Sequence, residues 1–165
     1  MTMQFEHEVH EETYRRIREY LPEFFEDLYH DEEDGHVYVR YGSTVLEVSV
    51  DAYGPKEAVV TIMSYCVQGV EVDEELLTAL LELNHARPLG AFSLVDKDIF
   101  FSYAMLGRDL QPRTLLSAIA AIADTADEYD DMLVARFGGQ TALERIRDTG
   151  GRRLRRKAVE EALPS

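Results

Sequence analysis

The spacing of apolar residues changes near His36, and this change constrains the fold more than any other feature of the sequence. Before it, apolar residues recur every three or four positions, as in a helix, and after it they alternate, as in a strand with one buried face. The alternating runs HVYVRY and TVLEVSVDA are separated by Gly42 and Ser43, a pair suited to a tight hairpin turn. The register set by this turn pairs Tyr41 with Thr44, Val39 with Leu46 and Val37 with Val48. Both strands then present apolar residues on the same face, which predicts an antiparallel hairpin packed on a core.

Three segments have the spacing of amphipathic helices. They cover residues 11–29, residues 74–86 and a long run from Pro112 that Gly138 and Gly139 end. In the first, Pro22 either kinks the helix or begins a new one, because proline lacks a backbone N–H. Asp73 is the predicted N-cap of the second.

Three further runs predict strands. AVVTIMSYCV is apolar on both faces and therefore predicts a central strand, and GAFSLV and DIFFSYAML form a second hairpin around Asp96 and Lys97. The predicted order is α-β-β-β-α-β-β-α, an α+β fold with a single antiparallel sheet and helices packed on it. We expect one domain over residues 1–139 and a basic helical tail over residues 140–165.

The composition excludes several classes of protein. In 165 residues, 32 Asp and Glu against 17 Lys and Arg give a net charge of −15, which opposes binding to nucleic acid or to an anionic membrane. Cys66 is the only cysteine, so no intramolecular disulfide or thiolate zinc cluster is available, and the reducing cytoplasm is the expected compartment. No apolar run approaches the ~20 residues of a membrane-spanning helix. We therefore expect a soluble cytoplasmic protein.

The order of elements over residues 12–135 resembles a known family. The most specific part of the resemblance is Leu83 and Asn84, then Gly90, Phe92 and Leu94, then Ile99 and Phe101, ahead of AIADTADEYDDML. These residues resemble the YbjN-like proteins, whose fold is shared with the CesT-type chaperones of type III secretion. The resemblance implies a small acidic cytoplasmic protein that often pairs with itself, holds an extended client segment on its sheet and helix surfaces and uses no cofactor.

The sequence gives only weak indications of a metal site or a catalytic site. His7 and His10 read H-x-x-H without an assignable third ligand, and a solvated acidic N-terminus is the default interpretation. The run DEEDG fails as a calcium loop, because His30 and Tyr41 stand where Asp and Glu are required. No phosphate-loop, nucleotide-binding or nucleophile-elbow motif occurs, and Cys66 lies in an apolar strand where a thiol is usually inert. We therefore expect no metal, no cofactor and no enzymatic activity. An enzyme or a metal-dependent protein is kept as a third alternative, because a missing motif is weak evidence against catalysis.

Two surface features bear on partners. The second hairpin has an apolar outer face, and the predicted partner-binding residues are Ala91, Val95, Phe100, Ala104 and Leu106. Two alternatives are open, a partner or second subunit on this face, or a helix of the same chain. The second feature is the basic run Arg152, Arg153, Arg155, Arg156 and Lys157. Without aromatic residues for base stacking, this run predicts a flexible tail, or an arm that docks on an acidic surface, rather than a nucleic-acid site.

The sequence thus predicts a non-enzymatic binding module that holds a protein or peptide client, as a homodimer. The alternative is a regulatory or adaptor protein that uses the same surface for one folded partner. An extended client predicts an apolar surface tolerant of client sequence, whereas an adaptor predicts one stoichiometric partner with polar specificity.

Overall fold

The computed structural model describes residues 3–42, 44–142 and 144. The elements are α1 (Glu8–Phe24), β1 (Leu28–His30), β2 (Val37–Tyr41), β3 (Thr44–Tyr53), β4 (Glu57–Gln68), α2 (Glu74–Ala86), β5 (Ala91–Val95), β6 (Asp98–Leu106), α3 (Pro112–Phe137) and β7 (Gln140–Thr141). The strands form one sheet in the order β1-β2-β3-β4-β6-β5, and β7 pairs with β4. Every pairing is antiparallel, so the predicted fold class is confirmed.

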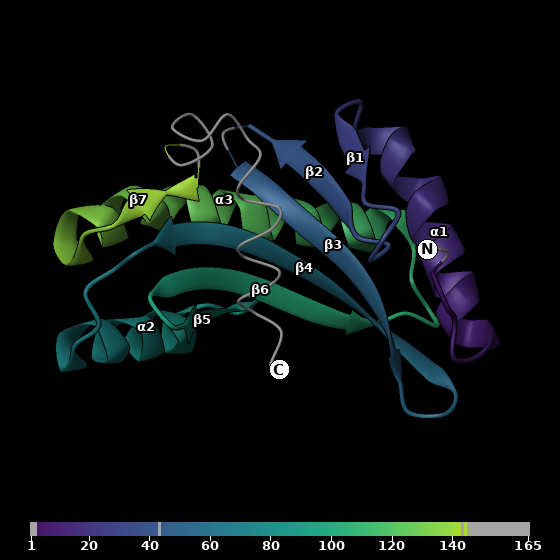
Figure 1. The fold of residues 1–165 in the computed structure, drawn as a ribbon, viewed down its shortest axis with the longest axis horizontal. Helices are drawn as coiled ribbons and strands as arrows, with labels where there is room; N and C mark the ends of the chain where they lie inside the picture. The colour runs from purple at the N-terminus through teal and green to yellow at the C-terminus, as the bar shows by residue number, and fades with distance from the viewer. Residues whose placement is uncertain (1–2, 43, 143, 145–165) are drawn as a thin grey trace.

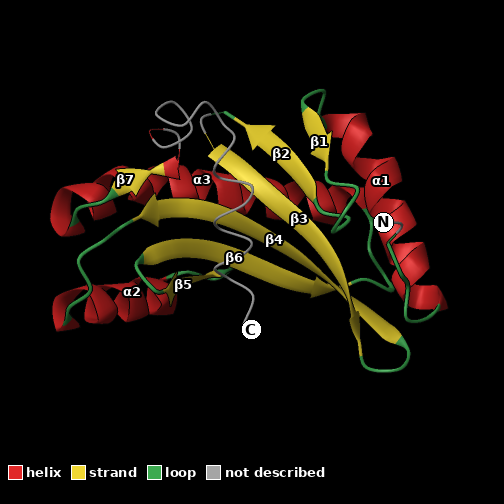
Figure 2. Ribbon diagram, in the orientation of Figure 1, coloured by secondary structure: helices red, strands yellow, loops and turns green. Residues whose placement is uncertain are grey.

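The helices pack on one side and one edge of this curved sheet (Figure 1; Figure 2). Helix α3 contacts β3, β4 and β6, α1 contacts β3 and β4, and α2 contacts the edge strand β5. The strand side chains that share a core with these helices include Val39, Leu46, Ile62, Ile99 and Phe101, all buried. We call the side of the sheet that carries them the inner face. The opposite side is the outer face, and among the described residues no helix from α1 to α3 shares a core cluster with it.

The register predicted for the first hairpin is confirmed, and the second hairpin turns at Asp96 and Lys97 as predicted. In the first, Tyr41 pairs with Thr44, Val39 with Leu46 and Val37 with Val48. In the second, Phe92 pairs with Phe101 and Leu94 with Ile99. Helix α2 has the predicted bounds, and Asp73 caps it by accepting a hydrogen bond of 2.8 Å from the backbone N–H of Leu76. The alternation of apolar residues was sufficient to predict the pairing of these strands, because one face of each strand is buried.

The N-terminal helix is shorter than predicted, and two short strands were missed. Helix α1 ends at Phe24, two residues after Pro22, so it neither runs to residue 29 nor restarts at the proline. Leu28 instead lies in β1, where it pairs with Val39. Strands β1 and β7 contain only three and two residues, too few to show an alternating pattern. Their pairing partners lie elsewhere in the chain, so only the assembled sheet defines them.

Asn84 and Gly90 fix the edge of the sheet. The side-chain amide of Asn84 donates to the carbonyl of Phe92 at 3.0 Å, and its oxygen accepts from the N–H of Phe92 at 2.6 Å. Asn84 therefore satisfies backbone groups that an edge strand otherwise offers to other chains. Gly90 has a φ of +77°, and a Cβ there would lie 2.7 Å from Phe101 and 2.9 Å from Ile122. The helix-to-strand turn thus requires glycine for conformation and for space.

We expect Gly90→Ala to lower the free energy of unfolding by about 3 kcal/mol, because it combines a left-handed backbone with overpacking of Phe101 and Ile122. Gly54→Ala is the matched control, since Gly54 has a φ of +65° but open space around it. The control should lose only about 1 kcal/mol, the backbone part of the cost. Urea unfolding of both variants measures the difference. Equal losses would show that Gly90 is needed for its backbone conformation alone.

Candidate binding surface on the outer face of the sheet

The outer face of the sheet divides into an open half and a covered half. The open half lies toward the β3–β4 hairpin and carries Tyr53, Val59, Ala104 and Leu106, which the strand registers place on the outer face. Tyr53 is 64% exposed and Leu106 58% exposed. The covered half contains Tyr65 and Phe100, which pack with Ala142 in a small second cluster. The same registers place Ser49, Asp51, Thr61 and Ser102 on this face. The open half is thus a solvent-exposed sheet surface on which apolar side chains lie among short polar ones.

The predicted partner-binding residues fall on both halves. Ala91, Val95, Ala104 and Leu106 are exposed. Phe100 is only 3% exposed, so the expectation that it offers an accessible apolar side chain is wrong. Its ring lies 5.3 Å from the ring of Tyr65, and Ala142 packs on both. Ala142, which directly follows β7, covers Phe100, whereas α1, α2 and α3 do not. Ala142 reaches this position because β7 pairs with β4.

A buried carboxylate lies at the junction of the two halves. Glu47, on the outer face of β3, is 6% exposed and accepts a hydrogen bond from the hydroxyl of Tyr65. Nδ1 of His36 lies 3.2 Å from Glu47 Oε1 and 3.4 Å from Asp34 Oδ2. Tyr38, the cross-strand partner of Glu47, adds a second hydroxyl contact. We call Asp34, His36, Tyr38, Glu47 and Tyr65 the carboxylate cluster. Sequence analysis missed it, although the pairing of Tyr38 with Glu47 was already implied by the hairpin register.

The pKa values in this cluster follow from burial and pairing. Burial acts to raise the pKa of Glu47, but His36 and the two tyrosine hydroxyls outweigh it and hold that pKa below its ordinary value. Burial acts to lower the pKa of His36, but the Glu47 carboxylate outweighs it and the pKa of His36 is raised. Burial and the nearby carboxylate raise the pKa of Tyr38 and of Tyr65. The favoured state near neutral pH is therefore an ionised Glu47 with neutral tyrosines that donate to it.

The other sequence candidates have structural partners. His7 Nδ1 accepts a hydrogen bond from the backbone N–H of His10 and caps α1, while His10 is 5% exposed with Nε2 3.2 Å from the carbonyl of Val50. The default view of a solvated N-terminus is therefore wrong for His10. Burial raises the pKa of Cys66 to about 12, so the thiol is inert packing as expected. Within residues 3–42, 44–142 and 144, no group of three or more His, Cys, Asp or Glu is placed to hold a metal ion.

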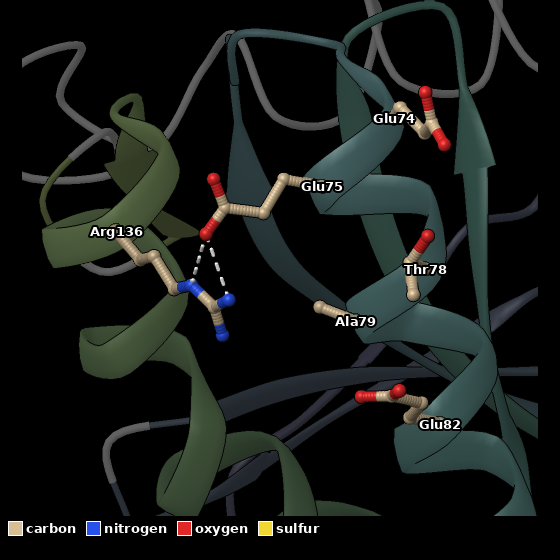
Figure 3. Close-up of a pocket in the computed structure, with 6 residues that line it drawn as sticks. All are labelled: Glu74, Glu75, Thr78, Ala79, Glu82 and Arg136. Atoms are coloured by element: carbon tan, nitrogen blue, oxygen red, sulfur yellow. Dashed lines mark hydrogen bonds and ion pairs between the residues drawn. The ribbon is translucent and has the colours of Figure 1, made fainter.

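Helix α2 carries a second exposed apolar surface. Leu77 is 45% exposed and Leu81 69% exposed, one turn apart on the same side of α2. On another side, α2 and α3 line a cavity of about 310 Å³, where Arg136 binds Glu75 with a shortest distance of 2.8 Å (Figure 3). The lining of that cavity includes the carboxylates of Glu74, Glu75 and Glu82, which do not suit an apolar segment. The leucine pair is therefore the accessible apolar feature of α2.

The profile of TY-Chap1, described as T3SS (YopN, CesT) and YbjN peptide-binding chaperone 1, matches residues 11–145. The chain belongs to this family of peptide-binding chaperones, and the resemblance seen in the sequence is confirmed. None of the curated protein sequences matches the chain.

Two solved structures have the same fold. One, the ExsC-ExsE complex, aligns with a TM-score of 0.60 and 14% identity, over 77% of this chain and 97% of that chain. Another, the HopA1-SchA chaperone-effector complex, aligns with a TM-score of 0.50 and 12% identity, over 74% of this chain and 91% of that chain. Among the described residues, no helix is both long and apolar enough to cross a membrane.

The ion pair between His36 and Glu47 predicts a pH dependence of stability. A pKa of His36 that is higher in the folded protein than in the unfolded chain stabilises the fold below the ordinary value of 6.5. That contribution is lost as the pH rises through the folded value. The loss of unfolding free energy caused by His36→Gln should therefore be largest near about pH 6 and smaller near about pH 8.5. Urea titrations of both proteins across this range measure it.

His85→Gln is the matched control, because His85 is an exposed histidine on α2. It should not reproduce the pH dependence of His36→Gln. A loss for His36→Gln that stays constant over the same range would mean that His36 contributes by packing and not by charge.

Proposed function

We propose that this protein holds an extended segment of a client protein on the open half of the outer face, without catalysis. The observation that carries the proposal is Leu106, which is 58% exposed on the outer face at the C-terminal end of β6, where it pairs with Val59 of β4. An exposed apolar sheet face gains about 25 cal/mol for each Å² of apolar surface that a client covers. Membership of a peptide-binding chaperone family supports the same activity. Both solved structures are complexes, one of them between a chaperone and an effector.

The chemistry of the open half favours tolerance of client sequence. Ala104 and Leu106 offer small and aliphatic contacts, and Asp51, paired with Val59, is the neighbouring carboxylate on the same face. Apolar contacts of this kind have little directional demand, so clients of different sequence fit. The adaptor alternative requires one folded partner with polar complementarity, and the carboxylate cluster is too buried to provide it directly. The surface therefore favours a segment over a folded partner.

We propose further that two copies pair through the leucines of α2. Leu77 and Leu81 are exposed apolar residues on a helix whose buried side already packs on the sheet. A second copy that covers them would remove both side chains from water in a symmetric contact. This arrangement leaves the outer face free for the client. With Cys66 buried and no disulfide to form, we place the protein in the cytoplasm.

A photoreactive amino acid at position 106 should capture client segments in the native cell, because the open half is where the client is proposed to lie. The same photoreactive residue at position 81 is the matched control, and it should capture a second copy of this chain instead. Mass spectrometry of the two sets of adducts checks both expectations. Capture of one folded partner in fixed ratio at position 106, with contacts from several of its surfaces, would favour the adaptor alternative and contradict the chaperone proposal.

Leu81→Asp should convert a dimer to a monomer, since a charge placed in an apolar contact typically costs a few kcal/mol of binding. Thr78→Asp places the same charge on the side of α2 that lines the cavity, and it should leave the dimer intact. Light scattering gives the mass and circular dichroism verifies the fold. A wild-type protein that is monomeric at tens of micromolar would disprove the pairing.

A further inference from the structure

Strand β3 is longer than the neighbour that covers its first half. Strand β2 pairs with residues 44–48 only, whereas β3 continues to Tyr53 beside β4. Because Tyr41 pairs with Thr44 across a two-residue turn, the even-numbered residues of β3 direct their backbone N–H and C=O groups toward β2. The backbone of Val50 therefore points to an edge of the sheet that β2 leaves uncovered.

The first turn of α1 lies along this uncovered edge. His10 is 5% exposed, and its Nε2 lies 3.2 Å from the carbonyl oxygen of Val50. Nε2 of His7 lies 3.1 Å from the carbonyl oxygen of Gly54, which directly follows β3. A carbonyl oxygen only accepts, so each Nε2 carries the proton and donates it. Two imidazole rings thus stand where a neighbouring strand would otherwise pair with β3.

The other nitrogen of each ring accepts a hydrogen bond from the backbone. Nδ1 of His7 accepts from the N–H of His10 at 3.3 Å, and Nδ1 of His10 accepts from the N–H of Glu6 at 3.3 Å. A nitrogen that accepts carries no proton, so both rings are neutral in this arrangement. Protonation of either ring would place an N–H against a backbone N–H. The four hydrogen bonds therefore require the neutral form of both histidines.

The segments that face this end of α1 add no net charge. They contribute two acids and two bases: Asp51 on β3, Lys56 in the β3–β4 turn, Glu57 on β4 and Arg108 after β6. Arg108 is paired with Glu57 at 3.4 Å. Among the described residues, the histidine that forms ion pairs is His36, so backbone groups rather than carboxylates hold His7 and His10.

Two effects of α1 itself oppose each other. The positive end of the helix dipole disfavours a charge on either ring, whereas Glu8 and Glu11 in the first turn favour one. Both glutamates are exposed, so water and salt screen their charges. The conflict between donors at the buried His10 is direct and is not screened. The balance therefore opposes a charged ring in the closed arrangement.

We propose that His7 and His10 form a pH-sensitive clasp that holds the first turn of α1 against β3 and opens when the rings gain protons. Histidine changes charge between about pH 5 and pH 8, so the clasp is closed above neutral pH and opens toward about pH 5. The rest of α1 stays in place through Thr13, Ile17 and Leu21, whose burial does not depend on a ring proton. Opening frees the edge of β3 beside Tyr53.

The direction of this effect is opposite to that of the pair between His36 and Glu47. The clasp stabilises the first turn at high pH, and its contribution is lost as the pH falls, because only the neutral rings fit. The pair between His36 and Glu47 loses its contribution as the pH rises. A measurement confined to the first turn of α1 therefore separates the two.

NMR of the full chain tests the clasp. Two-bond ¹H–¹⁵N spectra near about pH 8 should show both rings neutral with the proton on Nε2. Hydrogen exchange should show protected amides at Glu6 and His10, which donate to the two Nδ1 atoms. At about pH 5 the protection of both amides, relative to intrinsic exchange, should fall about tenfold while that of Ile17 and Leu21 stays.

The combined variant His7→Asn and His10→Gln has no ring proton to gain. Asparagine keeps an N-cap acceptor at position 7, and glutamine keeps an N–H donor at position 10. Protection of the amide at position 10 should then be the same near about pH 8 and about pH 5. His85→Gln, a change at an exposed histidine of α2, is the matched control and should keep the wild-type dependence.

Three results would overturn the clasp. The first is a wild-type ring with its proton on Nδ1 near about pH 8. The second is protection of Glu6 and His10 that does not change with pH in the wild-type protein. The third is a fall in protection in the combined variant as large as in the wild type, which would assign the effect to another group. If the combined variant does not fold, the ring spectra and the exchange of the wild-type protein decide.

Discussion

The structure depends on β4 being buried along its inner face and paired along both edges. This strand of twelve residues pairs with β3 from Glu57 to Ser64 and with β6 from Val59 to Gln68. On the β3 side, β7 pairs with Val67 and Gln68, beyond the point where β3 begins. Val60 and Ile62 are fully buried beneath the helices, so β4 belongs at once to the sheet and to the core. A register shift between Tyr65 and Val67 leaves Cys66 and Val67 both in the core. The outer-face alternation resumes beyond it, where β7 joins.

A core on one side only explains how a stable domain can also expose a binding surface. The helices α1 and α3 supply apolar cover for the inner face, and the long side chains Leu115, Ile119 and Ile122 of α3 are fully buried there. The outer face contributes little to this core and is free to vary in polarity. Asn84 satisfies the edge of β5, which limits pairing of that strand with other chains. An apolar surface is therefore offered for binding, while the backbone N–H and carbonyl of Phe92 are already satisfied.

The outer face also carries a buried charge at the junction of its two halves. The Glu47 carboxylate is buried yet ionised because two tyrosines and His36 surround it, and removal of one partner would leave an uncompensated buried charge. The cluster therefore holds β2, β3 and β4 in one arrangement at the junction of the two halves.

The sequence by itself determined the elements whose pattern is local. Alternation fixed the hairpin register from Val37 to Val48, and Asp73 with the leucines after it fixed α2 to the residue. The motif through Asn84, Gly90 and Phe92 indicated the family, which the profile match confirmed. Tertiary structure alone decided the burial of Phe100 and His10, because Ala142 and Val50, which contact them, lie far away in the chain. It also decided the carboxylate cluster and the strands β1 and β7, since two or three residues gain strand geometry only from a partner that the assembled sheet supplies.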